Sequence, residues 1–170
     1  GAEDRPEGTA GTVRVAQFGG TTLRLVRTAE LPRDPRLAQL GPDILAPGFD
    51  PEAAAIRLRT SPDEIGVALL DQKVVCGIGN IFKSEACFEA GIDPWRPAAS
   101  LTGPDDGNEA VRLLGIARHQ METAVETGKR PGRVYRKSGR PCFHCRSGRI
   151  RSRGQGDDNR TTYWCPVCQS

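Results

Sequence analysis

The strongest constraint on this 170-residue chain is a pair of CxxC motifs near its end, Cys142/Cys145 and Cys165/Cys168, separated by nineteen residues. Each motif presents two thiols from one tight turn, and two such turns can close a tetrahedron around one Zn²⁺, with Zn–S bonds of about 2.3 Å. Four thiolates leave no open position for water. The spacing therefore predicts a single structural zinc ion held by these four cysteines.

Other arrangements of these cysteines are less favoured. A disulfide within each CxxC motif would be strained, and no secretory segment accompanies the motifs. His144 lies inside the first motif and could replace a ligand, but four cysteines suffice, so we expect it at the surface. Cys76 and Cys87 fall in an apolar helical region and are predicted to be buried free thiols, which fits a reducing cytoplasm.

The residues between the two motifs predict a β-hairpin. Residues 149–153 alternate in polarity, residues 154–159 are turn formers, and residues 160–164 form a β-rich run. A structural zinc ion, which contributes on the order of 10 kcal/mol, can hold so small a hairpin rigid. A rigid hairpin that carries arginines can place guanidinium groups against phosphates.

Charge is distributed unevenly along the chain. Residues 1–128 carry 13 Lys/Arg against 19 Asp/Glu, a net charge of −6, whereas residues 129–170 carry 11 against 2, a net charge of +9. Such a basic segment suits a polyanion, most plausibly nucleic acid, although a basic run alone can also be a solvated linker. No run of apolar residues is long enough to predict a membrane span.

Upstream of the hairpin the pattern is mainly helical. Pro51, the Ser61–Glu64 capping box and the glycines at 91 and 128 mark the ends of four helices, at about 50–58, 64–70, 81–90 and 106–127. Helical spacing predicts core positions in the last of them at Val111, Leu114, Met121 and Val125. Residues 13–18 and 21–26 look like two strands, too few for a stable sheet, and residues 31–49 read as an irregular linker.

A glycine turn opens the third helix. Gly77, Gly79 and the following Asn80 form a GxGN sequence in which backbone N–H groups can approach an anion at a helix N-terminus. Asn80 could cap the helix or donate its side-chain amide to a phosphate. Lys73 could reach the same anion. The motif alone is weak, because most such turns are structural.

Three segments together resemble the formamidopyrimidine-DNA glycosylase/endonuclease VIII family: residues 71–85 (DQKVVCGIGNIFKSE), 90–94 (AGIDP) and 160–169 (RTTYWCPVCQ). The resemblance covers about residues 38–170 and implies a helix–two-turn–helix domain followed by a zinc finger. It also implies that Asn80 and Arg160 grip the phosphates that flank an everted nucleotide, with Gly79 and Lys73 as further DNA-binding candidates.

The family's catalytic residues have no recognisable counterparts in this sequence. Family enzymes attack the sugar C1′ with the amine of an N-terminal proline, assisted by the next residue, a glutamate. The printed sequence starts with Gly1. Pro6-Glu7 resembles the family's opening motif, but the nitrogen of Pro6 is acylated and cannot act as an amine, so we attribute this similarity to chance. No catalytic residue is therefore expected in this chain, which reads as the C-terminal part of such an enzyme.

The overall expectation is an α+β chain in three parts. Residues 1–37 would be a remnant of a β-sandwich with its linker, 38–130 the helix–two-turn–helix domain, and 131–170 the zinc-bound hairpin. The expected function is binding of duplex DNA with oxidised bases or abasic sites, as part of a bifunctional DNA glycosylase/AP lyase of base-excision repair. We expect a cytoplasmic, nucleoid-associated monomer without membrane contact. The alternatives are a non-catalytic, zinc-dependent DNA-binding module and a zinc ribbon for protein contacts.

Overall fold

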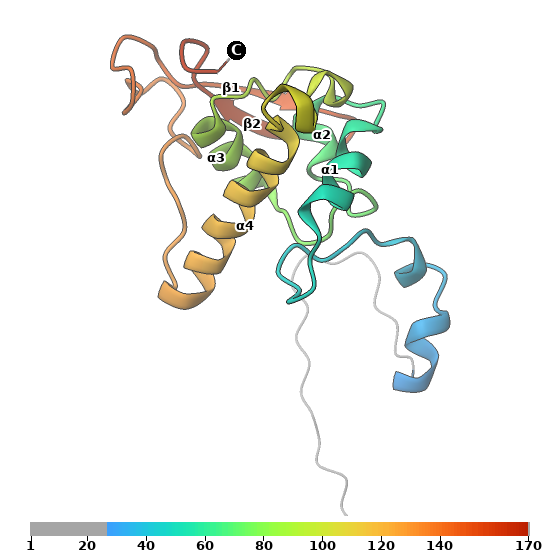
Figure 1. The fold of residues 1–170 in the computed structure, drawn as a ribbon. Helices are drawn as coiled ribbons and strands as arrows, with labels where there is room; N and C mark the ends of the chain where they lie inside the picture. Colours follow the sequence, from blue (N-terminus) through green and yellow to red (C-terminus); the bar gives the residue numbers. More distant parts are fainter. Residues whose placement is uncertain (1–26, 170) are drawn as a thin grey trace, which may run out of the picture.

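The computed structural model describes residues 27–169. The strands predicted at 13–18 and 21–26 therefore lie outside the described residues. From residue 27 the chain forms two short 3-10 helices, Thr28–Arg33 and Leu37–Gln39, before it joins the main body. Figure 1 shows this segment lying away from the packed helices.

Four α-helices build the main body: α1 (Pro51–Arg59), α2 (Ile65–Ala68), α3 (Asn80–Ala90) and α4 (Glu109–Thr127). Two 3-10 turns, Ala98–Ser100 and Pro104–Asp106, join α3 to α4. The long helix α4 packs against both α1 and α3 (Figure 1), and the apolar core lies between these three helices. This confirms the predicted helical domain.

The predicted helix ends are set by local chemistry. The Asp50 carboxylate accepts hydrogen bonds from the amides of Glu52 and Ala53, and so caps α1 one residue before Pro51. At their C-termini, α3 and α4 stop at Gly91 and Gly128, whose φ angles of 70° and 68° lie in the left-handed region. Glycine adopts this conformation without the steric cost of a Cβ.

The second helix is shorter than predicted. Instead of spanning 64–70, α2 is a single turn, and Glu64 stands at its N-cap without a side-chain capping bond. The first amides of α2 are satisfied from elsewhere, since Ile65 N donates to Arg96 O at 2.8 Å and Gly66 N to Pro94 O at 2.9 Å. The capping box is therefore not needed, because the chain that follows α3 supplies the acceptors.

Two of the predictions about burial were wrong. Leu114 and Met121 belong to the core, and Val111 packs against it, but the Val125 side chain is 73% exposed. The last turns of α4 extend beyond the other helices of the described chain, so these helices do not cover Val125 (Figure 1). Cys87 is buried as expected, whereas Cys76 is only partly buried, because it lies in the loop that pairs with Asp43.

The predicted hairpin is confirmed. Strands β1 (Arg151–Gln155) and β2 (Arg160–Trp164) pair antiparallel, with Gln155 opposite Arg160 next to the turn. β2 packs on α3, and a second small apolar core forms beneath the hairpin around Phe88 and Val134. No helix within residues 27–169 is long and apolar enough to cross a membrane.

Candidate metal centre and nucleic-acid interface

The four predicted metal ligands meet at one point. Sγ of Cys142 lies 3.7 Å from Sγ of Cys168, and Sγ of Cys145 lies 3.8 Å from Sγ of Cys165. All four sulfur atoms lie within 4.8 Å of one another. A tetrahedron with metal–sulfur bonds of about 2.3 Å has edges of about 3.8 Å, so the sulfurs are placed as a tetrahedral thiolate site requires. The four cysteines are therefore positioned to bind one metal ion.

The four thiols of the cluster differ in their surroundings. All six cysteines are free in the structure, with the facing sulfur atoms of the cluster 3.7–3.8 Å apart, and so not joined as disulfides. Hydrogen bonds from Ser147 and from the Gly148 amide lower the pKa of Cys145 to about 6, whereas burial raises the pKa values of Cys165 and Cys168. His144 is exposed, as predicted, although its Nδ1 lies 3.5 Å from Sγ of Cys168.

A buried carboxylate ties α3 to the segment that leads into the metal cluster. Glu85 is fully buried, and its two oxygens accept hydrogen bonds from the backbone amides of Arg133, Val134 and Tyr135 at 2.8–2.9 Å. Three donors satisfy the carboxylate, which would otherwise be costly to bury. The contact fixes where the basic segment after α4 turns back toward α3.

The start of α3 also holds β2 directly. The side-chain amide of Asn80 donates to the Thr161 carbonyl at 2.8 Å, and Lys83 Nζ donates to Thr162 Oγ1 at 2.5 Å. The backbone amide of Tyr163 donates to Ser84 Oγ at 3.4 Å. Three consecutive residues of β2 therefore bind one face of α3, so that the hairpin and the glycine turn form one unit.

Gln72 organises the glycine turn. Its side-chain oxygen accepts from Gly77 N at 2.8 Å, and its amide donates to the Leu70 and Ile78 carbonyls. Gly77 has a φ of 103°, which favours glycine. Gly79 is the N-cap of α3, and a Cβ built there would meet no atom within 4 Å, so the helix N-terminus opens onto free space. Such an end attracts anions.

The structure rules out one of the two roles predicted for Asn80. The residue begins α3 instead of preceding it, so it cannot act as the N-cap, and no capping bond forms. Its amide already contacts Thr161, and its Oδ1 is buried without a partner among the described residues. The capping prediction was therefore wrong, because the N-cap position falls on Gly79.

Three of the four predicted DNA-binding residues converge. Gly79, Asn80 and Arg160 line one cavity of about 360 Å³, together with Gln72 and Asp158. The Arg160 side chain is exposed, and no hydrogen bond or ion pair to another residue of 27–169 engages its guanidinium. The cavity therefore places a free guanidinium beside a helix N-terminus.

Lys73 lies apart from this group. Its side chain is exposed and borders a different hollow, lined also by Arg57 and Ser61. Its backbone is fixed locally, because its amide donates to Asp71 Oδ1 and its carbonyl accepts from Arg57. Lys73 and Asn80 are seven residues apart in the sequence. The turn that Gln72 organises lies between them, and their side chains line different cavities.

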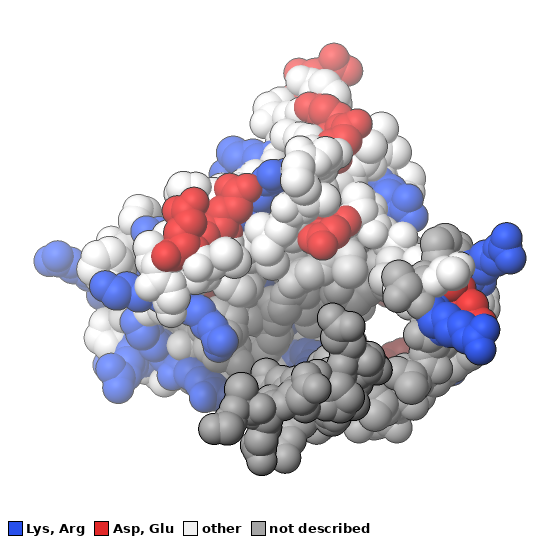
Figure 2. All heavy atoms as spheres, turned by 90° about the horizontal axis from the view of Figure 1, so that it is seen from below, with Lys and Arg blue, Asp and Glu red and all other residues white. Residues whose placement is uncertain are grey.

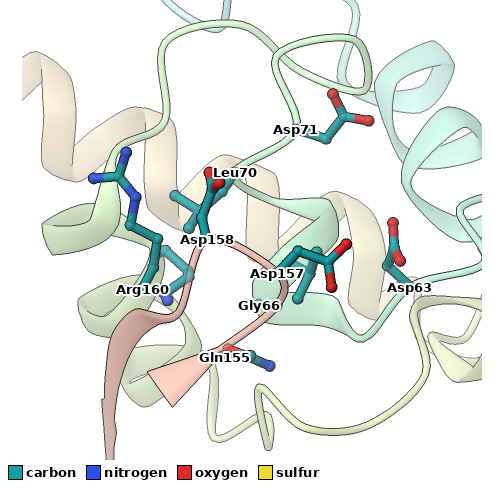
Figure 3. A pocket seen from close by; sticks show the side chains of 11 residues that line it. Asp63, Gly66, Leu70, Asp71, Gln155, Asp157, Asp158 and Arg160 are labelled. Atoms are coloured by element: carbon teal, nitrogen blue, oxygen red, sulfur yellow. The ribbon is translucent and has the colours of Figure 1, made fainter. Parts of the chain in front are cut away.

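A second cavity, of about 340 Å³, also borders Arg160, and none of its other members was predicted as a site residue. Lys83 and Gln155 line it together with four carboxylates (Figure 3): Asp63, Asp71, Asp157 and Asp158. Asp157 and Asp158 come from the hairpin turn, whereas Asp63 and Asp71 flank α2. The only sequence signal for Lys83 was its place three residues after Asn80, on the same face of α3.

Charge is also unevenly spread over the surface. In the view of Figure 2, Lys and Arg side chains are dense along the left edge, with further ones at the right, while acidic side chains lie mainly near the centre and the top of that face. A dense group of basic side chains attracts polyanions.

Comparison with known proteins adds the family context. Residues 40–135 match the family model described as the formamidopyrimidine-DNA glycosylase H2TH domain. The chain is 42% identical over 158 residues to a probable endonuclease 8 2 of Streptomyces coelicolor, across 87% of this chain and 55% of that relative. It is 38% identical over 139 residues to the DNA-(apurinic or apyrimidinic site) lyase Nei2 of Mycolicibacterium smegmatis, across 79% and 54%.

Solved structures agree with the described fold. The MutM (Fpg) protein of Thermus thermophilus superposes with a TM-score of 0.72 and 32% identity, covering 85% of this chain and 59% of that one. The Lactococcus lactis Fpg in complex with DNA that contains an abasic site gives 0.71 and 25%, covering 85% and 57%. This chain therefore spans a little over half the length of the relatives that it matches.

Proposed function

This chain belongs to the formamidopyrimidine-DNA glycosylase/endonuclease VIII family, and we propose that it binds duplex DNA with damaged bases or abasic sites through the Gly79–Asn80 turn and Arg160. The observation that carries this proposal is the shared cavity of these residues, which brings the exposed Arg160 side chain and the N-terminus of α3 to the same hollow. A backbone phosphate fits both groups, because a guanidinium and a helix N-terminus each bind oxyanions.

The proposed metal is one structural Zn²⁺. Four thiolates at tetrahedral spacing are the ligand set of structural zinc sites, and they leave no coordination position for substrate. The ion would join the two CxxC turns at the base of the hairpin and so hold β2 against α3. It would take no part in chemistry.

Lys73 has a secondary place in the proposal. Because its side chain is exposed and lies outside the cavity of Asn80 and Arg160, it can contact only a neighbouring phosphate or none. We assign DNA binding to residues 38–130 and 131–170 acting together, because side chains of α3 in the first part form hydrogen bonds with β2 in the second. We also propose a cytoplasmic, nucleoid-associated monomer.

DNA binding is tested by titration with two duplexes of one sequence, one intact and one with a stable abasic analogue. We expect about tenfold tighter binding to the abasic duplex, since its backbone is easier to bend toward Arg160 and the turn. The logarithm of the affinity should fall linearly with the logarithm of salt concentration. Equal affinity for the two duplexes, or binding insensitive to salt, would contradict the proposal.

Catalysis is proposed for the longer family enzymes and not for a polypeptide of residues 1–170 by itself. The family resemblance places the nucleophile on an N-terminal proline amine, whereas the two residues that it carries over to this chain, Asn80 and Arg160, are assigned to phosphate binding. We therefore expect a polypeptide of residues 1–170 neither to excise oxidised bases nor to nick abasic DNA.

Borohydride trapping on an abasic duplex checks this expectation, because it captures the Schiff base that an attacking amine forms. No covalent adduct should appear when the chain is saturated with DNA. A rapid adduct would show that an amine within residues 1–170 acts as nucleophile. The matched control is a longer family enzyme on the same duplex, which should be trapped.

A further inference from the structure

A buried chain of polar side chains crosses the hairpin. Lys83 Nζ donates to Thr162 Oγ1 at 2.5 Å, and Thr162 Oγ1 donates to Gln155 Oε1 at 2.6 Å. Lys83 and Thr162 are fully buried, and Gln155 is 4% exposed. The chain therefore runs from α3 through β2 to β1 with its side chains almost completely buried.

Gln155 extends the chain to the start of α2. Its side-chain amide donates to Pro94 O and to Glu64 Oε2, both at 2.8 Å. The fit is close at this end, since a Cβ built on Gly66 would lie 2.2 Å from Gln155 Oε1. Helix α3, both strands and the approach to α2 are thus joined by one polar connection that uses none of the metal ligands.

Burying the ammonium group of Lys83 costs desolvation free energy that packing alone does not require. The pKa of its ammonium is lowered to about 8, mainly by burial, with Cys87 acting in the opposite direction and Arg160 adding to the lowering. An apolar side chain of similar length would fill the same space without this desolvation. A positive donor in this position therefore calls for a role that packing does not provide.

We propose that Lys83 is a positioning residue for Arg160, which it places by holding Thr162. Side chains two residues apart on a strand lie on the same face, so the bond that fixes Thr162 against α3 also sets the side of the hairpin from which Arg160 extends. The neighbouring hydrogen bond from the Asn80 amide to Thr161 O fixes the position of β2 along the axis of α3. The inference rests on the proposed DNA binding through Arg160.

The charge of Lys83 adds a second effect. The charged and titratable groups around it are Cys87 on α3, Arg160 on β2 and the aspartates at 63, 71, 157 and 158, which line the same cavity (Figure 3). A positive Lys83 strengthens the field in which Arg160 meets a phosphate. Deprotonation above about pH 8 removes that charge, so DNA affinity should fall as pH rises through this range.

The hydroxyl of Thr162 gives the sharpest test. Thr162→Val keeps the shape but removes the hydroxyl, whereas Thr162→Ser keeps it. With zinc content unchanged, we expect Thr162→Val to speed amide hydrogen exchange in residues 160–163 and to weaken binding to the abasic duplex about fivefold, as expected for a lost hydrogen bond. Thr162→Ser should restore most of both. Exchange rates equal to those of the unchanged chain would overturn the proposal.

The pH profile separates positioning from plain structural support. Between pH 7 and pH 9 the unchanged chain should lose affinity about fivefold more than Lys83→Met, which has no charge to lose at this site. Parallel profiles would refute the role of Lys83. If the unchanged chain bound neither duplex, the proposed function would fail, and hydrogen exchange in Thr162→Val would alone decide whether Thr162 is held from Lys83.

Discussion

Replacing Cys165 with serine is expected to abolish specific DNA binding, with a loss of affinity of at least about 100-fold, because Arg160 and its neighbours each contribute roughly 1–3 kcal/mol only while the hairpin is ordered. Cys165 is fully buried, and its sulfur lies 3.8 Å from that of Cys145. Removing one of four thiolates releases most of a metal-binding free energy on the order of 10 kcal/mol, which is also folding free energy for the hairpin.

The helical domain should survive this loss. The main apolar core is built from residues before 122, and the hairpin has its own small core around Ile150 and Cys165. Circular dichroism should therefore show retained helix, while metal analysis shows the loss of one zinc per chain. Cys76→Ser is the matched control, since this partly buried thiol lies outside the cluster. A Cys165→Ser variant that kept both zinc and DNA binding would contradict the assignment.

The second large effect is expected at Glu85. Glu85→Gln removes the charge that receives three backbone amides and turns an NH₂ group toward at least one of them. We expect the free energy of unfolding to fall by about 3 kcal/mol, since hydrogen bonds to a charged acceptor are strong and a buried donor is left without a partner. For a chain of this size, that corresponds to roughly 10 °C in Tm.

Thermal or urea unfolding measures this change. The control is Glu122→Gln, which removes the same charge from a half-exposed side chain whose only described ion pair is with Arg118. Surface pairs of this kind contribute little, so the control should change stability by less than about 1 kcal/mol. If Glu85→Gln were as mild as Glu122→Gln, the buried carboxylate would not be what holds residues 133–135 against α3.

Local chemistry made part of this molecule predictable. The cluster of four cysteines follows from two spacings, and the helix ends at Asp50, Gly91 and Gly128 follow from capping residues whose effect extends over one turn. The hairpin follows from alternation and turn formers within sixteen residues. Each of these features depends only on residues that are close together in the sequence, so the sequence alone is enough to predict it.

Features that depend on distant partners were missed or misjudged. α2 is one turn long because its first amides bond to residues 94 and 96, some thirty positions later. Val125 keeps helical spacing but is exposed, since periodicity does not say how far along α4 its partners reach. Lys83 and Thr162 are 79 residues apart, and no local pattern indicates that they bond.

The residues of the candidate DNA site also differ in how well the sequence predicted them. The resemblance to the family assigned Asn80 and Arg160, and the structure brings both to one cavity. Lys73 was added because it is near in sequence, and the structure separates it. The contact of the Asn80 amide with the Thr161 carbonyl could be found only once β2 was placed.

The most direct test of this account is the affinity of Arg160→Ala for the abasic duplex, measured at fixed salt with zinc content verified. The account predicts a loss of about 10- to 100-fold, equivalent to roughly 1–3 kcal/mol for a lost charge-assisted phosphate contact, together with a shallower salt dependence. Arg118→Ala removes the same charge from α4, where Arg118 pairs with Glu122, and should have little effect. Equal affinity of Arg160→Ala and the unchanged chain would contradict the claim that this hairpin arginine grips the DNA backbone.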